Sequence, residues 1–354
     1  MKCIKVVYSQ TMTKAQINKI KEMLSASQNI VIIPHRNPDG DAIGSSLALY
    51  HFLKSNHKVT IVAPNDYPVF LKWLPGNENV RFFDKQNSQS KKALDKANII
   101  FLLDFNALHR LGNDMESTVE KLKGTFIMID HHQDPDTSIT EYIYSDTSIC
   151  STSQMIYHFM DKLGEIDKID AAIATCMYTG IMTDTGSFRF PSTTSTTHRI
   201  IADLIDKGAN NAQIHTNIYD TNSYSRLQLL GRALSNLKVE TDYRTAYITL
   251  SQDELDQFSF QKGDTEGVVN YALSLKGVVF AAIFIEDIDQ KIIKISFRSK
   301  GSFSVNQFSR NHFNGGGHDN AAGGRSERSL KETVSNFLNL LPKYETSLKK
   351  SDEI

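Results

Sequence analysis

The sequence predicts an α/β protein of two domains, the first with a parallel sheet covered by helices on both faces and the second a smaller α/β domain with a mixed sheet. Three observations predict this class. The chain has 354 residues, and a domain holds about 150 residues. In the first half, continuous apolar runs of strand length alternate with helix patterns, as in buried parallel sheets. After about residue 240, longer strand runs lie beside helix patterns in a different order.

The first half supplies most of the expected elements. A helix is expected over residues 13–24, because Thr13 and Gln16 have capping-box spacing and Ile17, Ile20 and Leu24 share one face. Apolar runs predict strands at residues 30–34, 58–63, 98–103 and 125–129. Helical periodicity predicts helices at 42–53, 150–163 and 167–182, followed by a short strand at 187–190.

A Ser/Thr-rich stretch beginning at Pro191 marks the end of the first domain. A helix over residues 197–207, which Gly208 ends as a C-cap, and another over 223–237 form a connection. Beyond it, strands are expected at 246–250, 277–285 and 291–298, and helices at 265–275, 305–313 and 330–341. The predicted boundaries are therefore 1–192, 193–237 and 238–346.

Composition excludes several classes of protein. The hydrophobic fraction of 40% and the charged fraction of 22% exclude disordered, collagenous and coiled-coil chains. The formal net charge of −1 argues against a protein that wraps long duplex nucleic acid. No run reaches the roughly 20 apolar residues of a membrane span, and the N-terminus lacks an apolar signal core. Three widely spaced cysteines, Cys3, Cys150 and Cys176, predict no disulfide framework and a reducing, cytoplasmic location.

Four apolar runs end at side chains of the kinds that bind metal ions. These side chains are His35, Asp39 and Asp41; Asp104; Asp130, His131 and His132; and Asp184. Ligands of open parallel sheets bind beyond the carboxyl ends of the strands, and three of the four clusters lie at such ends by pattern. A single Asp after a strand is as often a helix cap, and a lone His pair is more often a surface feature. The coincidence of four clusters favours one shared site.

The chemistry of these side chains points to divalent cations. In extended backbone, Asp39 and Asp41 point to the same side, Pro38 favours that geometry at Asn37, and Gly40 leaves room between the carboxylates. Five carboxylates in one crevice repel each other unless cations are present. A mixture of carboxylates and imidazoles suits Mn²⁺ or a related ion. A carboxylate shared by two ions about 3.5–4 Å apart is the usual basis of two-metal phosphoryl hydrolysis.

The four clusters resemble the motifs of the DHH phosphoesterases. The matching segments are HRNPDGDAIG from His35, Asp104, Asp130-His131-His132, and TDTG from Thr183. The segment NGGGH, which ends at His318, and the AAG that ends at Gly323 resemble the signature of the DHHA1 domain. The resemblance covers nearly the whole chain and is closest to the nanoRNase and pAp-phosphatase branch. It implies a DHH domain joined by a helical connection to a DHHA1 domain, with the active site in the cleft between them.

The resemblance also implies roles for individual residues. For one ion the implied ligands are His35 and Asp39, and for the other they are Asp41, His131 and Asp184. Asp104 would bridge the two ions, Asp130 would orient an imidazole, and His132 would face the phosphate. The implied cofactor is a pair of Mn²⁺ ions, with Mg²⁺ or Co²⁺ as alternatives.

A second group of residues is expected to bind substrate. Consecutive glycines expose backbone N–H groups to a phosphate, and residues 291–325 hold six basic side chains and one acidic one. An Arg at a strand end, as at Arg298, suits a phosphate, although a surface salt bridge is the alternative. Similarly, the glycines could form a plain loop and Arg110 a solvated helix residue. The expected set is Arg110, Arg298, Ser299, Gly315, Gly316, Gly317 and His318.

Together these features predict a two-metal phosphohydrolase that cleaves short oligonucleotides to mononucleotides, removes the 3′-phosphate of pAp, or does both. A cyclic- or linear-dinucleotide phosphodiesterase is the alternative. An inorganic pyrophosphatase is disfavoured by the glycine segment, and a non-catalytic RNA-binding protein by the intact ligand set. The expected partners are short single strands or small bisphosphate nucleotides, without long duplexes or membranes. A homodimer is left open.

Overall fold

The computed structural model describes residues 9–351, and Cys3 and the start of the N-terminal segment lie outside that range. The chain divides into two compact units between Thr221 and Asn222. Each unit has its own sheet and its own cores. We call them the first unit and the second unit.

The first unit is built on a seven-stranded sheet in the order β1-β7-β6-β5-β2-β3-β4. Six of the strands are parallel, and β1 is antiparallel to β7. The strands are β1 (Ser9–Gln10), β2 (Asn29–Pro34), β3 (Lys58–Ala63), β4 (Val80–Phe82), β5 (Ile99–Leu103), β6 (Thr125–Asp130) and β7 (Tyr142–Asp146). Because β6, β5 and β2 are neighbours and run in one direction, their carboxyl ends meet at one edge of the sheet.

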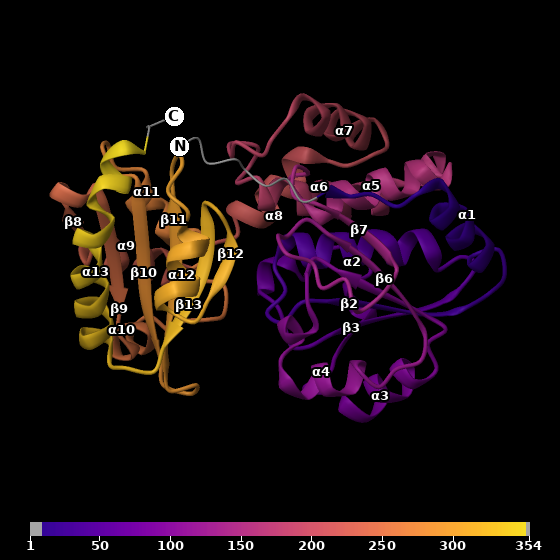
Figure 1. The fold of residues 1–354 in the computed structure, drawn as a ribbon, viewed down its shortest axis with the longest axis horizontal. Coiled ribbons are helices and arrows are strands. Elements are labelled where there is room, and N and C mark those ends of the chain that lie inside the picture. The colour runs from indigo at the N-terminus through magenta and orange to yellow at the C-terminus, as the bar shows by residue number, and fades with distance from the viewer. Residues whose placement is uncertain (1–8, 352–354) are drawn as a thin grey trace. The chain divides into compact units, whose positions relative to one another are not determined.

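Helices cover both faces of this sheet, as Figure 1 shows. The helices are α1 (Lys14–Met23), α2 (Gly40–Leu53), α3 (Asn87–Asp95), α4 (Asn113–Val119), α5 (Thr152–Leu163), α6 (Ala171–Asp184), α7 (Ser195–Asp206) and α8 (Asn211–Tyr219). One core contains Ile32 of β2 with residues of α1, α2, α5 and α6. The other contains Ile33 of β2 with residues of α3 and α4. Successive strand residues therefore point to opposite cores, which explains why the strands are apolar throughout.

The second unit has a six-stranded mixed sheet in the order β12-β13-β11-β10-β9-β8. Only the β9–β10 pair is parallel. The strands are β8 (Lys238–Glu240), β9 (Thr245–Leu250), β10 (Phe280–Asp287), β11 (Ile292–Ser299), β12 (Gly316–His318) and β13 (Ala321–Ser326). The helices are α9 (Tyr224–Ser235), α10 (Gln252–Gln257), α11 (Val268–Leu273), α12 (Val305–His312) and α13 (Leu330–Lys350).

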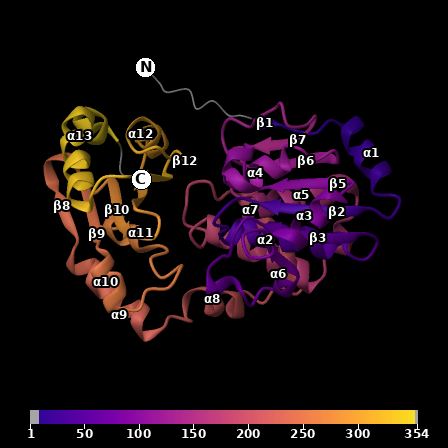
Figure 2. The same ribbon diagram turned by 90° about the horizontal axis from the view of Figure 1, so that it is seen from below.

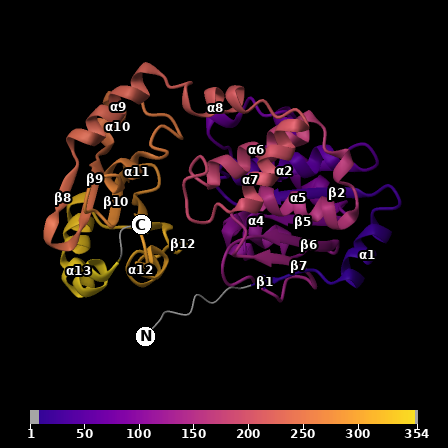
Figure 3. The same cartoon turned by 90° about the horizontal axis from the view of Figure 1, so that it is seen from above.

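Figures 2 and 3 show this second sheet between α12 and α13 on one face and α9, α10 and α11 on the other. The side chains of β10 contribute to the cores on both faces of the sheet. Phe280 and Phe284 belong to the core under α12 and α13, whereas Ile283 belongs to the core under α9 and α11. Alternation with period two thus buries both faces of β10 from Phe280 to Phe284, and the last three residues of the strand are partly buried.

The predicted fold class is confirmed, and so is the capping box that begins α1 at Thr13 and Gln16. The predicted strand at 187–190 is wrong. Gly186, Ser187 and Phe188 have φ values of 57°, 60° and 66°, so the backbone turns in the left-handed region and cannot extend. The predicted domain boundaries remain a prediction, although the division at Thr221 falls inside the expected connection. Within residues 9–351, no helix is long and apolar enough to cross a membrane.

The helix predicted at 330–341 is too short, because α13 continues through Pro342 to Lys350. A proline inside a helix costs about 3 kcal/mol. Two contacts offset this cost: Leu348 is buried in the core, and the guanidinium of Arg244 donates hydrogen bonds to the backbone oxygens of Leu348 and Ser351 at 3.2 and 2.8 Å.

Candidate metal centre

The carboxyl ends of three neighbouring strands place the first group of polar side chains. His35 follows β2, Asp104 follows β5, and Asp130 is the last residue of β6 and precedes His131. The side chains of His35, Asp104, Asp130 and His131 are all buried. Asp104 has φ of 67°, and its N–H donates to the backbone oxygen of Ile129 at 3.2 Å. The chain therefore turns sharply at Asp104 while β5 is still paired with β6.

The start of α2 differs from the expected extended backbone. Asp39 is the N-cap, and its Oδ1 accepts hydrogen bonds from the N–H groups of Asp41 and Ala42 at 3.1 Å each. Asp41 therefore lies in the first turn of a helix. Asn37, at φ of 55°, is in the left-handed region, which Asn tolerates. Asn37 and Asn65 exchange two hydrogen bonds that hold this turn, and these bonds outweigh the bias imposed by Pro38.

Close packing of α2 and α6 brings Asp41 and Asp184 towards the strand ends. A Cβ atom on Gly44 would lie 2.6 Å from the backbone oxygen of Cys176 in α6. A Cβ atom on Gly40 would lie 2.3 Å from Thr183 Oγ1, so Gly40 makes room for α6 and not for neighbouring carboxylates as the spacing suggested. Glycines at these positions permit the two helices to touch along their backbones.

Asp104 lies between two groups of side chains. Its Oδ2 is 3.5 Å from His35 Nε2, which is 3.8 Å from Asp39 Oδ2. Its Oδ1 is 3.4 Å from His131 Nε2, which is 3.8 Å from Asp41 Oδ2 and 3.4 Å from Asp184 Oδ2. The donor atoms of His35, Asp39 and Asp104 lie within 4.8 Å of one another, and so do those of Asp41, Asp104 and His131.

The geometry of this cluster fits bound cations. His35 Nδ1 is 2.8 Å from the backbone oxygen of Arg36, and His131 Nδ1 is 3.3 Å from that of Ile149. A proton on Nδ1 leaves the lone pair on Nε2, the nitrogen that faces the carboxylates. The Nε2-to-carboxylate distances of 3.4–3.8 Å exceed those of good hydrogen bonds. They are close to the separation of about 3.0–3.5 Å expected between two ligands of one ion.

Burial, repulsion between carboxylates and attraction to imidazoles shift the pKa values of the acidic groups. Burial and the charges of Asp104 and Asp184 raise the pKa of Asp41 well above its usual value. Burial also raises the pKa of Asp184 to about 6, although the charge of His131 opposes this shift. Burial opposes ionisation of Asp104 as well, but the nearby imidazoles of His131 and His35 hold its pKa well below the usual range. Positive charge within the cluster therefore stabilises the carboxylates, as divalent cations would.

His132 pairs with Asp130. The Nδ1 atom of His132 is 2.7 Å from Asp130 Oδ1 and 3.9 Å from Asp104 Oδ1. Asp130 is fully buried. The structure thus places Asp130 where it orients the imidazole of His132.

Sequence reasoning missed two residues at the start of α5. The backbone N–H groups of Thr152 and Ser153 donate to the carboxylate of Asp41 at 2.6 and 2.8 Å, and Thr152 Oγ1 donates to Asp104 Oδ1 at 3.0 Å. No spacing in the sequence relates these residues to the ligands.

Arg110 lies in a short 3₁₀ helix, Leu108–Leu111. Its backbone oxygen accepts a hydrogen bond from the N–H of Arg36 at 2.9 Å, and its charge acts to lower the pKa of His35. The structure therefore brings Arg110 close to the ligand cluster.

In the second unit, the predicted substrate-binding residues lie at one end of the sheet. Arg298 pairs with Ala321, which also pairs with His318. The Ser299 hydroxyl donates to the backbone oxygen of Phe303 at 2.6 Å and accepts from Asn320 at 2.9 Å, so its contacts hold the strand end together.

Most of the glycine segment lies in a strand and not in the plain loop that was the alternative interpretation. Gly316 to His318 form β12, which is antiparallel to β13. A Cβ atom on Gly315 would lie 1.9 Å from the backbone oxygen of Gly323, and one on Gly317 would lie 2.5 Å from that of Ala321. Packing therefore requires these two glycines. The three atoms nearest to a Cβ atom on Gly316 would belong to the side chains of Arg310 and Asn306, at 3.7 Å or more.

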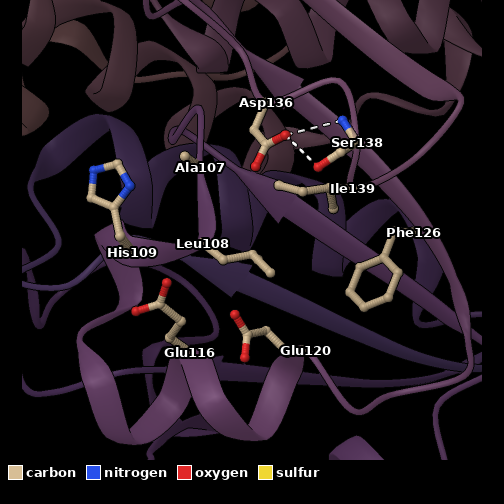
Figure 4. Close-up of a pocket in the computed structure, with 9 residues that line it drawn as sticks. All are labelled: Ala107, Leu108, His109, Glu116, Glu120, Phe126, Asp136, Ser138 and Ile139. Carbon is tan, nitrogen blue, oxygen red and sulfur yellow. Dashed lines mark hydrogen bonds between the residues drawn. The ribbon is translucent and has the colours of Figure 1, made fainter.

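A pocket of about 370 Å³ lies beside the loop that follows Asp104, and Figure 4 shows it. Its lining residues are Ala107, Leu108, His109, Glu116, Glu120, Phe126, Asp136, Ser138 and Ile139. Asp136 Oδ1 accepts hydrogen bonds from the N–H and hydroxyl of Ser138 at 3.0 and 2.6 Å. The three carboxylates at this pocket, those of Glu116, Glu120 and Asp136, repel a phosphate.

Comparison with known proteins identifies the family. Residues 29–181 match the N-terminal domain of the DHH family, and residues 242–345 match the DHHA1 domain. The bifunctional oligoribonuclease and PAP phosphatase NrnA of Thermus thermophilus is 32% identical over 86% of this chain and 86% of its own length. The chain belongs to the DHH family. The protein of the same name from Bacillus subtilis is 26% identical over 85% of this chain and 90% of its own length.

A solved structure shares the fold of this chain over nearly its whole length. The crystal structure of an exopolyphosphatase-related protein from Bacteroides fragilis has 41% sequence identity and a TM-score of 0.90. The match covers 98% of this chain and 99% of the other. The expected architecture, a DHH domain followed by a DHHA1 domain in a phosphoesterase, is therefore confirmed. The location of the active site in a cleft between the domains remains a prediction, as does the homodimer.

Proposed function

We propose that this DHH-family protein is a two-metal phosphohydrolase that cleaves short oligonucleotides to mononucleotides and removes the 3′-phosphate of pAp. The observation that carries the proposal is the position of Asp104. Its two oxygens face different imidazoles, His35 on one side and His131 on the other. The names of the NrnA relatives, oligoribonuclease and PAP phosphatase, support the choice of substrates.

The proposed ligands are divided by the two oxygens of Asp104. His35 and Asp39 would hold one ion, and Asp41, His131 and Asp184 the other, with Asp104 shared. The ions would be Mn²⁺, with Mg²⁺ or Co²⁺ as alternatives, since carboxylate and imidazole ligands suit all three. When bound, such a pair polarises the phosphoryl group and activates water for in-line displacement.

The chain's own residues would orient the phosphate and move protons. Because Asp130 holds Nδ1 of His132 at 2.7 Å, the other ring nitrogen would face the phosphate and could donate a proton to the leaving oxygen. Arg110 would add positive charge on the side of His35. Low exposure of His35, Asp104 and His131 strengthens each of these electrostatic interactions.

The DHHA1 domain would bind a second phosphate or a terminal nucleotide. Arg298 of β11 and His318 of β12 both pair with Ala321 of β13, the strand between them. The side chain of Arg310 lies beside Gly316. Such a grip on a remote group would favour short substrates, because it adds binding energy only where the second phosphate is at the right spacing.

A Mn²⁺-supplemented substrate panel tests the proposal. It would compare initial rates on pAp, di- to pentanucleotides, a cyclic dinucleotide, pyrophosphate, a long single strand and a duplex at fixed salt. We expect pAp and the short oligonucleotides to be the best substrates, and EDTA or Asp104→Asn to reduce their turnover by orders of magnitude. A preference for the cyclic dinucleotide would favour the phosphodiesterase alternative. Faster degradation of the long strand or the duplex, or parent activity in Asp104→Asn, would refute the proposal.

A further inference from the structure

Helix α5 begins against two of the proposed metal ligands. Its N-cap is Ser151, and its first residue, Thr152, is fully buried. The Thr152 N–H donates to Asp41 Oδ2 at 2.6 Å, and the Ser153 N–H donates to Asp41 Oδ1 at 2.8 Å. Both oxygens of Asp41 are thereby held by backbone donors of one helix turn.

The Thr152 side chain reaches a different carboxylate. Its hydroxyl donates to Asp104 Oδ1 at 3.0 Å. This is the oxygen that faces His131 at 3.4 Å, while Oδ2 faces His35 at 3.5 Å. A carboxylate can turn about its terminal torsion at little cost, and a turn of Asp104 would remove its oxygens from the two imidazoles. The Thr152 hydroxyl therefore favours the orientation of the Asp104 carboxylate in which one oxygen faces His131 and the other faces His35.

The residue type suits this task. A β-branched side chain in a helix has few χ1 rotamers, so the hydroxyl of Thr152 has a defined direction. A hydrogen bond to a charged group is also stronger than a neutral one. One residue therefore fixes Asp41 through its backbone and Asp104 through its side chain, although these ligands come from α2 and from the end of β5.

We propose that Thr152 is a positioning residue of the metal centre: it holds the Asp104 carboxylate so that one oxygen faces His35 and the other faces His131. This inference rests on the two-metal site of the proposed function but not on the identity of the substrate. It predicts that removal of the hydroxyl weakens metal binding itself, and that a serine, which keeps the hydroxyl, largely preserves it.

The test compares Thr152→Val, which keeps the shape, with Thr152→Ser, which keeps the hydroxyl. Thr179→Val is the matched control, because Thr179 is also a fully buried threonine and its hydroxyl donates to the backbone oxygen of Thr175. Titration calorimetry with Mn²⁺ on metal-free protein gives affinity and stoichiometry without any substrate. Circular dichroism checks that each variant is folded, and Thr152→Ala replaces the valine variant if that one does not fold.

We expect Thr152→Val to weaken binding of at least one Mn²⁺ by 10–100-fold, the usual range for residues that support metal ligands. Thr152→Ser should stay within about threefold of the parent protein, well below that range, and Thr179→Val should match the parent. Parent affinity in Thr152→Val, or equal losses in the valine and serine variants, would overturn the inference. A parent protein that binds two Mn²⁺ but hydrolyses no nucleotide would refute the proposed function and leave this comparison valid.

Discussion

Gly180 offers a sharp test of how the metal centre is built. A Cβ atom on Gly180 would lie 1.9 Å from Ser153 Oγ, 2.8 Å from Ser153 Cβ and 2.8 Å from Asp41 Oδ1. Ser153 Oγ, the nearest of these atoms, can move away by rotation of its own side chain. The Cβ atom of Ser153 and the carboxylate of Asp41 cannot be relieved by rotation of that hydroxyl. Gly180→Ala must therefore shift α5, Asp41 or both.

Two opposing effects set the expected magnitude. Alanine is better than glycine in a helix interior by about 1 kcal/mol, whereas overpacking costs about 1–3 kcal/mol. The free energy of unfolding should therefore fall by at most about 2 kcal/mol. Displacement of Asp41 should weaken Mn²⁺ binding and turnover by about 10–100-fold.

Gly231→Ala is the matched control, since Gly231 also lies in a helix, α9, and a Cβ atom there would have no neighbour within 4 Å outside its own helix turn, among the described residues. That variant should gain about 1 kcal/mol of stability with unchanged Mn²⁺ affinity. Calorimetric titration and initial rates on pAp give the comparison. The double variant Ser153→Gly/Gly180→Ala removes two of the three clashes and should recover most of the loss. Parent-like Mn²⁺ affinity in Gly180→Ala, or no recovery in the double variant, would refute the packing argument.

The remaining predictions concern substrate binding, acid stability and metal binding. Arg298→Ala should cost about 1.5–3 kcal/mol in kcat/KM for pAp, the range for a hydrogen bond to a charged group, and much less for bis-p-nitrophenyl phosphate; equal losses would place Arg298 at the reacting phosphate. Burial opposes ionisation of Asp66, but Lys72 and Lys85 lower its pKa to about 2. Its stabilising effect is therefore complete above pH about 4 and is lost as the pH falls towards 2. Because Asp66 is 35% exposed, Asp66→Asn should cost only about 1 kcal/mol at pH 7, and a difference from the parent that persists unchanged at low pH would contradict this assignment. Finally, Mn²⁺ at 100 times its Kd should stabilise the first unit by about 2.7 kcal/mol per site, read from the fluorescence of Trp73, the one tryptophan of the chain; an unshifted transition would count against metal binding there.

The ligand positions could be predicted from the sequence because they follow from strand direction. Parallel strands bring their carboxyl ends to one edge, so His35, Asp104 and Asp130 could be placed together from apolar runs alone. The backbone conformation around Asp41 was predicted wrongly, because it depends on local contacts of the chain and not on strand direction. Asp39 caps a helix that begins at Gly40, and the chain enters that helix through the left-handed Asn37. A cap and an extended pair have the same residues at the same spacing, and only the contacts with Asn65 distinguish them.

The glycines show a second limit of the sequence. A run of glycines is equally compatible with a backbone that a ligand can reach and with a backbone packed closely against another strand. At Gly315 and Gly317 the cause is close approach of β13. Gly316 alone, of these three, has no backbone atom among its nearest neighbours, so it is the position at which a phosphate could approach the main chain. The residues that contact them distinguish the three positions, and those residues lie four or more positions away in the chain.

The metal centre therefore depends on helix packing as much as on its ligands. Asp41 and Asp184 belong to α2 and α6, which approach closely where Gly44 faces the backbone of Cys176, and α6 approaches α5 where Gly180 faces Ser153. Thr152, 48 residues from Asp104, is linked to it only through the position of α5. The sequence motifs identify the ligand residues, whereas the contacts of Gly44, Gly180 and Thr152 determine the distances between those ligands. Because repulsion among the buried carboxylates favours any relaxation that separates them, the packing of α2, α5 and α6 must oppose that repulsion before the cations bind. Substitutions at Gly44, Thr152 and Gly180 should accordingly weaken the metal centre although every ligand residue is unchanged.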